Sequence, residues 1–125
     1  MKSTNVFVYG TLKKGFPNHH VLGEQAEYVG GASTHESFTL IDLGAFPALS
    51  LGGDVKDQVP ISGEVYKVPN LAALDRLEGY PHFYDRMQIN TTQGLAWVYH
   101  VKIENYPDHP KVVGGDWVKN YNIGS

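Results

Sequence analysis

Cysteine is absent from this chain of 125 residues. Its absence excludes disulfide bonds, thiol nucleophiles and thiolate metal sites, and it fits a reducing compartment. Long basic runs are also lacking, because the longest is the pair formed by Lys13 and Lys14, and the net charge is −3. Nucleic-acid binding usually needs a basic patch or stripe, so we expect no nucleic-acid partner.

Long hydrophobic runs are missing as well. No segment approaches the ~20 apolar residues of a membrane-spanning helix, and the apolar run near the N-terminus is too short for a secretory signal. Hydrophobic residues still make up 42% of the chain, which is enough for a packed core. We therefore expect one soluble, cytoplasmic domain over residues 1–125, without a membrane partner. No pattern indicates an oligomeric state.

Strand signals dominate the sequence. Segments rich in β-branched, aromatic or alternating apolar residues are separated by Gly, Ser and Thr. They cover residues 6–9, 26–32, 36–43, 61–68, 83–91 and 95–104. A turn is predicted at residues 51–54, and residues 44–53 are expected to be a loop. Thr92-Gln93-Gly94 predicts a hairpin between the last two strands.

One helix is well marked. Asn70 is a suitable N-cap residue, and the three leucines at helical spacing that follow it predict a shared apolar face. Gly79 is expected to end this helix. A second short helix is predicted over residues 19–24. Many strands with two or three short helices indicate an α+β fold with a strongly curved or closed sheet.

The segment Tyr9-Gly10-Thr11-Leu12 follows the first predicted strand. Gly10 permits a turn with φ > 0 and a close approach of the backbone to a ligand. Successive N–H groups in such a turn bind anions, so the segment is a candidate site for a carboxylate or an oxyanion. The alternative is a simple strand-exit turn whose tyrosine packs in the core. The glycine spacing of nucleotide-binding loops is absent.

Glu78 is predicted to lie in the last turn of the helix, beside aromatic residues. A carboxylate at the negative end of the helix dipole is disfavoured by ~0.3–1 kcal/mol, and Tyr80, Phe83 and Tyr84 would exclude water from it. Both effects raise the pKa toward the working range of a general base. The alternative is a solvated glutamate on the surface.

Two further charges lie near Glu78 in the sequence. Asp75, three residues earlier, is expected either as a partner of Glu78 or, more simply, as a polar residue on the outer face of the helix. Arg86 is expected to pair with Glu78 or Asp75, or to be a surface cation.

Other catalytic patterns are weak. The six histidines show no H-x-x-x-H or H-x-H spacing, so we expect no metal site. No G-x-S-x-G segment occurs, which argues against a serine hydrolase.

Three segments in order resemble the γ-glutamylcyclotransferase-like superfamily. They are Phe7-Val8-Tyr9-Gly10-Thr11-Leu12, Gly63-Glu64-Val65-Tyr66, and LDRLEGYPHFYDR from Leu74 to Arg86. Residues 8–22 are most similar to the γ-glutamylaminecyclotransferase branch, and the closing Gly114-Gly115-Asp116-Trp117 recurs in small bacterial members. Each motif is weak alone, but the ordered set spans nearly the whole chain and is specific.

The resemblance implies a small mixed β-barrel with a cavity at one mouth. It also implies an enzyme that converts γ-glutamyl amines or γ-glutamyl amino acids into 5-oxoproline and a free amine. The family's catalytic acid corresponds to Glu78, and its substrate-holding loop corresponds to Tyr9, Gly10, Thr11 and Leu12.

This chemistry would need neither a protein nucleophile nor a cofactor, because the substrate's own α-amine attacks its γ-carbonyl. Tyr66 is then a candidate for lining the cavity, and Tyr84 and Arg86 are candidates for orienting Glu78 or the substrate. Removal of a γ-glutamyl tag would differ only in the leaving group. The alternative from another class is a non-catalytic module that binds a small metabolite or a protein with the same cavity.

Overall fold

The structure is a computed structural model that describes residues 3–10, 12–16, 18–44, 46–51, 55–106, 108–112 and 115. These residues form six strands, one α-helix and three 3-10 helices. In chain order they are β1 (Thr4–Val8), η1 (His19–Leu22), β2 (Glu27–Asp42), β3 (Pro47–Leu51), η2 (Val55–Asp57), β4 (Val59–Val68), α1 (Ala72–Glu78), β5 (Asp85–Thr91), β6 (Gly94–Lys102) and η3 (Ile103–Asn105). The predicted α+β class is confirmed.

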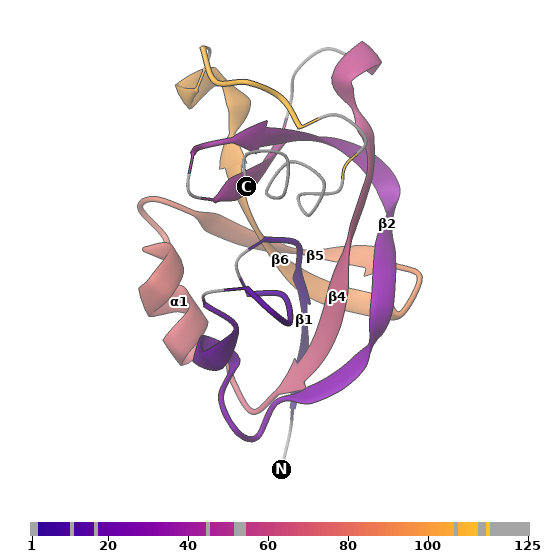
Figure 1. Ribbon diagram of the computed structural model, residues 1–125, viewed down its shortest axis with the longest axis vertical. Coiled ribbons are helices and arrows are strands. Elements are labelled where there is room, and N and C mark those ends of the chain that lie inside the picture. The colour runs from indigo at the N-terminus through magenta and orange to yellow at the C-terminus, as the bar shows by residue number, and fades with distance from the viewer. Residues whose placement is uncertain are drawn as a thin grey trace.

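Five of the strands close into a barrel, which Figure 1 shows from the side. Antiparallel pairing joins β1 to β4, β4 to β2, β2 to β5 and β5 to β6. A parallel contact between Val6 and Trp97 joins β6 back to β1. β3 lies alongside as a sixth strand, antiparallel to β2 and parallel to β6. The predicted closed sheet and the hairpin of β5 and β6 are therefore confirmed.

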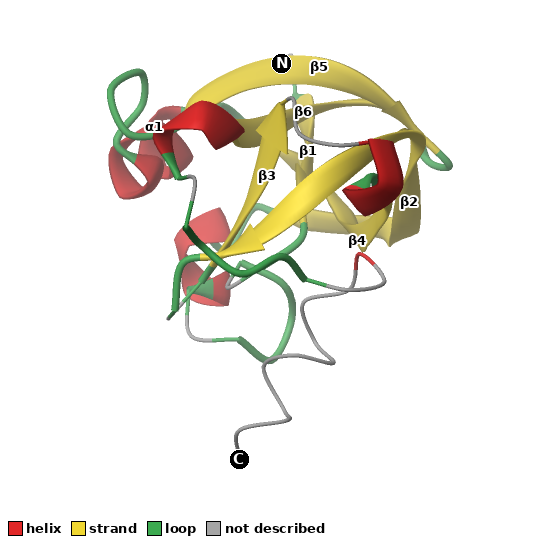
Figure 2. Cartoon of the chain, turned by 90° about the horizontal axis from the view of Figure 1, so that it is seen from above, coloured by secondary structure: helices red, strands yellow, loops and turns green. Residues whose placement is uncertain are grey.

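The last three residues of β1 are buried on both faces of the strand, which explains why the sequence is continuously apolar there. Val6 and Val8 belong to a cluster that includes Leu71 and Leu74 at the start of α1 and within it. Phe7, between them, belongs to a second cluster drawn mainly from the strands. Neighbouring side chains on a strand point to opposite faces, so β1 separates the barrel interior from the layer that holds α1 (Figure 2).

α1 forms where the sequence predicts it. Asn70 Oδ1 accepts a hydrogen bond from the N–H two residues further on, at 3.0 Å. Gly79 ends the helix in the left-handed region, with φ 66° and ψ 34°, where glycine pays no steric cost. Leu71 and Leu74 are buried, but Leu77 is 39% exposed. The predicted apolar face is thus correct only for its first two leucines.

Three segments differ from the sequence-based expectations. The two strands predicted before residue 44 form one strand, β2, whose register against β4 shifts twice, so the residues between them act as bulges rather than as a break. Part of the predicted loop is β3, where Pro47 is tolerated as the first residue of the strand. The second predicted helix is the 3-10 turn η1. The turn predicted at 51–54 and the motif at 114–117 lie largely outside the described residues.

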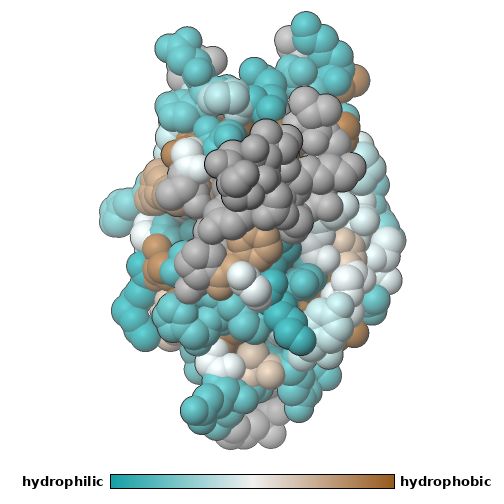
Figure 3. All heavy atoms as spheres, viewed as in Figure 1, coloured by the Kyte–Doolittle hydropathy of each residue, from teal (hydrophilic) through white to brown (hydrophobic). Residues whose placement is uncertain are grey.

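The surface is mixed in character. On the face drawn in Figure 3, hydrophilic residues predominate and apolar residues form small patches among them. Within the described part of the chain, no helix has the length and apolar character needed to cross a membrane.

Gly10 follows β1 where the chain passes very close to Pro47. A Cβ added at Gly10 would lie 2.7 Å from Pro47 Cγ and 2.8 Å from Pro47 Cδ. Gly10 is not among the glycines with positive φ, so the predicted left-handed turn at this position is wrong. The residue is small because two chain segments meet here.

Gly10→Ala is expected to lower the free energy of unfolding by ~1–3 kcal/mol, because a rigid proline ring has to move. Gly31→Ala is the matched control, since its added Cβ would meet only Tyr28 Oη, at 3.8 Å. Urea unfolding of the two variants measures the difference. Equal stability of the two variants would contradict the close contact.

Candidate active site

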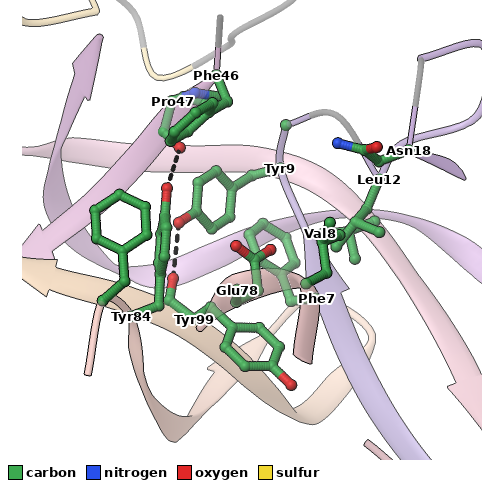
Figure 4. A pocket seen from close by; sticks show the side chains of 13 residues that line it. Phe7, Val8, Tyr9, Leu12, Asn18, Phe46, Pro47, Glu78, Tyr84 and Tyr99 are labelled. Carbon is green, nitrogen blue, oxygen red and sulfur yellow. Dashed lines mark hydrogen bonds between the residues drawn. The ribbon is translucent and has the colours of Figure 1, made fainter. Parts of the chain in front are cut away.

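A pocket of about 120 Å³ lies between the end of β1, the start of β3, the end of α1 and β6. Its lining brings together segments that are far apart in the sequence and is mostly apolar or aromatic. The lining residues are Phe7, Val8, Tyr9, Gly10, Leu12, Asn18, Phe46, Pro47, Leu77, Glu78, Phe83, Tyr84 and Tyr99. Figure 4 shows their side chains grouped around the carboxyl group of Glu78. A mostly apolar cleft with a few polar groups, here Glu78 and Asn18 among them, is typical of small-molecule sites.

Glu78 reaches the pocket because it is the last residue of α1. Leu71 and Leu74 fix the start and the middle of the helical segment to the core, and Gly79 then turns the chain away. The Glu78 side chain consequently points among the rings of Tyr9, Tyr84 and Tyr99 (Figure 4).

Burial raises the pKa of Glu78 from 4.5 to about 7, and loss of hydration is the cause. Burial also raises the pKa values of Tyr9 and Tyr84, followed by smaller effects from nearby charges and hydrogen bonds. The phenols are therefore neutral, and Glu78 is the group that changes charge near neutral pH among the described lining residues. Elsewhere in the described part of the chain, no group of three or more His, Asp or Glu side chains is arranged to hold a metal ion.

The hydroxyl groups of Tyr9 and Tyr84 are bonded to the backbone. Tyr9 Oη donates to the carbonyl oxygen of Tyr99 at 2.7 Å and accepts from the N–H of Leu49 at 2.8 Å. Tyr84 Oη donates to the carbonyl oxygen of Pro47 at 3.0 Å (Figure 4). Since these protons are already used, the rings act as walls of the pocket and do not solvate the carboxylate.

The loop after β1 is held from outside the pocket. The ring nitrogen Nδ1 of His19 makes a hydrogen bond of 2.9 Å with the carbonyl oxygen of Leu12. Glu64 Oε1 accepts from the N–H of Lys14, also at 2.9 Å. Gly10 and Leu12 line the pocket, as does Tyr9. Thr11 lies outside the described residues.

Two predicted site residues lie away from the pocket lining. Tyr66 donates to Glu64 Oε1 at 3.0 Å and packs edge-on against the ring of His19, so it supports the loop from behind. Arg86 pairs with Asp75, with 2.8 Å between Nη1 and Oδ2. The expectation that Asp75 is simply a polar residue on the outer face of the helix is wrong, because Arg86 of β5 and Tyr99 of β6 bind its carboxylate.

Several lining residues were not found from the sequence. Phe46 and Pro47 were assigned to a loop, and Tyr99 was seen only as part of a strand. The approach of the start of β3 to the loop at Gly10 has no local signal in the sequence, because it depends on a contact between residues that are 37 positions apart. The alternating pattern of β6 could have indicated that Tyr99 faces the helix layer.

Comparison with known proteins agrees with the geometry. The chain matches the family described as gamma-glutamyl cyclotransferase, AIG2-like, over residues 6–119. It is 40% identical over 114 residues to a putative gamma-glutamylcyclotransferase of Vibrio cholerae, covering 90% of this chain and 93% of the relative. It is 41% identical over 102 residues to gamma-glutamylaminecyclotransferase of Rattus norvegicus, covering 74% of this chain and 66% of the relative.

A solved structure supports the fold. The crystal structure of an AIG2-like protein from Mus musculus matches with a TM-score of 0.76 at 28% identity, covering 90% of this chain and 87% of that one. The resemblance read from the motifs and the barrel implied by it are both confirmed, and the enzyme class is confirmed at the level of the family. The chain belongs to the gamma-glutamyl cyclotransferase, AIG2-like family.

Proposed function

We propose that this protein converts γ-glutamyl amines or γ-glutamyl amino acids into 5-oxoproline and a free amine, with Glu78 as the general base. The observation that carries the proposal is the partly buried carboxyl group of Glu78, whose pKa is raised to about 7, in a pocket that the loop after β1 also lines. A module that only bound an anionic metabolite would gain nothing from this acid. The similarity to gamma-glutamylaminecyclotransferase of the rat supports the substrate class.

In the proposed reaction, ionised Glu78 takes a proton from the substrate's α-ammonium group. The free α-amine then forms a bond to the γ-carbonyl carbon, and the bond from that carbon to the leaving nitrogen breaks. Glu78 passes its proton to the leaving nitrogen. The attacking nitrogen releases a second proton to solvent as it becomes the ring amide. The free amine takes up one proton from solvent and leaves as an ammonium ion. A carboxyl group with a pKa near 7 exchanges protons in both directions at neutral pH.

The loop after β1 is proposed to bind the charged end of the substrate. No lysine or arginine is among the described residues that line the pocket, so backbone N–H groups of Gly10, Thr11 and Leu12 would bind the α-carboxylate or the developing oxyanion. Tyr9 and Tyr84 would fix the shape of the cavity. Holding the amine against the carbonyl in this way is worth ~7–11 kcal/mol, which is why no nucleophile or cofactor is invoked.

The rim of the pocket favours an apolar leaving group. Leu77 and Phe83, which are 39% and 45% exposed, both line it. Phe46 packs edge-on against Phe83, with 6.2 Å between ring centroids. An alkyl chain would find contacts here, whereas a leaving group with a carboxylate would meet Glu78 and no cation of the described lining. We therefore propose that γ-glutamyl alkylamines are better substrates than glutathione.

Release of 5-oxoproline from γ-glutamyl-butylamine, γ-glutamyl-ε-lysine, γ-glutamyl-alanine and glutathione tests the proposal. We expect the fastest release from γ-glutamyl-butylamine, whose leaving group has an alkyl chain and no carboxylate. We also expect a fall of ~10²–10⁴-fold in Glu78→Gln, the size of a general-base contribution. Glu27→Gln, which removes an exposed carboxylate of β2, is the matched control. No release from any compound by the folded protein would favour a binding module instead.

The raised pKa of Glu78 also predicts how activity and stability depend on pH. Because the base must be ionised, kcat/KM of the wild type should rise with pH around a midpoint near 7.

The folded state holds the Glu78 proton more tightly than the unfolded state, so this stabilisation is complete below pH 4.5 and is lost as the pH rises through 7. Glu78→Gln should therefore melt at a higher temperature than the wild type at pH 8, with the difference vanishing toward pH 4.5. Equal melting temperatures at both pH values would contradict the burial of a charge.

A further inference from the structure

The guanidinium group of Arg86, on β5, contacts the chain on both sides of Glu78. Its Nη1 donates to the two carboxylate oxygens of Asp75 at 2.9 and 2.8 Å, three residues before Glu78. Its Cζ lies 4.4 Å from the ring centroid of Tyr80, two residues after Glu78. One side chain of the barrel wall thus holds the helical turn that carries Glu78 at both of its ends.

Tyr99 connects this contact to the pocket. It is the register partner of Arg86 across the hairpin of β5 and β6, and its hydroxyl donates to Asp75 Oδ1 at 2.7 Å. Tyr99 also lines the pocket, where its carbonyl oxygen accepts a hydrogen bond from the hydroxyl group of Tyr9. The Asp75 carboxylate is therefore bound by two neighbouring strands of the same wall that shapes the pocket.

Apart from Asp75 and Tyr80, the end of α1 is held by backbone hydrogen bonds: the carbonyl oxygen of Glu78 accepts from the N–H of Tyr84 at 3.2 Å, and that of Gly79 accepts from the N–H of Phe83 at 2.8 Å. The helix has seven residues, too few to be stable without tertiary contacts. Leu77 is partly exposed, and the hydrogen bond from the N–H of Gly79 to the carbonyl of Arg76 is long, at 3.4 Å. These bonds hold the backbone that follows the helix, whereas the side-chain contacts of Asp75 and Tyr80 join this turn to the barrel wall and so help to set the place of the Glu78 carboxyl group.

We propose that Arg86, acting through Asp75 and Tyr80, is a positioning residue that fixes the carboxyl group of Glu78 in the pocket. This inference rests on the proposed function for its catalytic consequence, and it replaces a direct role of Arg86 in binding substrate. A displacement of about 1 Å at a reacting group can cost ~10²-fold in rate, so a loosened helix end lowers kcat without removing any contact to the substrate.

The ion pair of Asp75 and Arg86 also affects the ionisation of Glu78, and the experiment can separate this effect from the positioning of its carboxyl group. Asp75 and Glu78 are three residues apart on one helix, so an unpaired Asp75 would repel an ionised Glu78. Arg86 cancels that charge. The other ionisable side chains of the described pocket lining are the phenols of Tyr9, Tyr84 and Tyr99; burial raises their pKa values, so they stay neutral. Loss of the Arg86 charge alone should move the activity midpoint to higher pH, whereas loss of both charges should not.

The test is a double-mutant cycle of Asp75→Asn, Arg86→Gln and the two together, with Arg86→Lys and the exposed helix residue Arg76→Gln as comparisons. We expect kcat to fall ~10–100-fold in each single variant, with KM within about twofold, and the double variant to be no worse than the singles. Arg86→Lys should keep the wild-type pH midpoint while recovering only part of kcat, and Arg76→Gln should match the wild type. A raised KM with unchanged kcat in Arg86→Gln would mean that Arg86 binds substrate and would overturn the inference, as would additive losses.

Hydrogen exchange tests the same contact without activity. The amide of Tyr80 donates to the carbonyl of Asp75 at 3.0 Å, so the amides of Gly79 and Tyr80 should exchange about tenfold or more faster in Arg86→Gln and Asp75→Asn, while those of β1 and β4 stay unchanged. Unchanged exchange at Gly79 and Tyr80 would overturn the inference. If the wild type releases no 5-oxoproline, the proposed function fails, and exchange alone decides whether Arg86 holds the helix end.

Discussion

The removal of water from the Glu78 carboxyl group is the constraint on which the site depends. The phenol groups of Tyr9 and Tyr84 stand beside it, and a hydrogen bond from either to the carboxylate would favour the anion and lower its pKa. Both instead donate to backbone carbonyl oxygens. The two tyrosine rings therefore exclude water from the Glu78 carboxyl group without donating a hydrogen bond to it. Because the anion is poorly solvated, the pKa of the carboxyl group is about 7.

The barrel supplies the fixed parts that this arrangement requires. The backbone acceptors come from β6 and from Pro47 at the start of β3, and β1 carries Tyr9 to the point where these strands approach the end of α1. Gly10 lets the loop pass against Pro47. The side of the barrel formed by β5 and β6 then binds α1 through Asp75. A closed sheet is suited to this task because its strands hold one another in register.

The sequence predicted the elements whose signals are local. Gly79 ends the helix in both the sequence and the structure, and the turn at Thr92-Gln93-Gly94 joins β5 to β6 as expected. At the start of the helix the N-cap residue is Leu71, one position after the predicted Asn70, although the Asn70 side chain still accepts a hydrogen bond from the first turn. Glu78 and Tyr9 were found because their motifs are continuous in the chain, and both line the pocket.

Features that depend on distant segments were missed or misread. β3 was assigned to a loop because its pairing with β2 and β6 leaves no periodic pattern in five residues. Gly10 was explained by backbone conformation, although the reason for it is Pro47. Asp75 was expected on the outer face because nothing near it in the sequence shows that Arg86 of β5 and Tyr99 of β6 bind its carboxylate.

The central claim is that the pocket holds Glu78 as a carboxyl group that ionises near neutral pH. A ¹³C NMR titration of the glutamate side-chain carboxyl carbons, with Glu78 assigned by comparison with Glu78→Gln, measures this most directly. The account predicts a midpoint near 7 for Glu78, well above the value of about 4.3 for a glutamate in a model peptide. A Glu78 midpoint between 4 and 5, about that of a solvated glutamate, would contradict it.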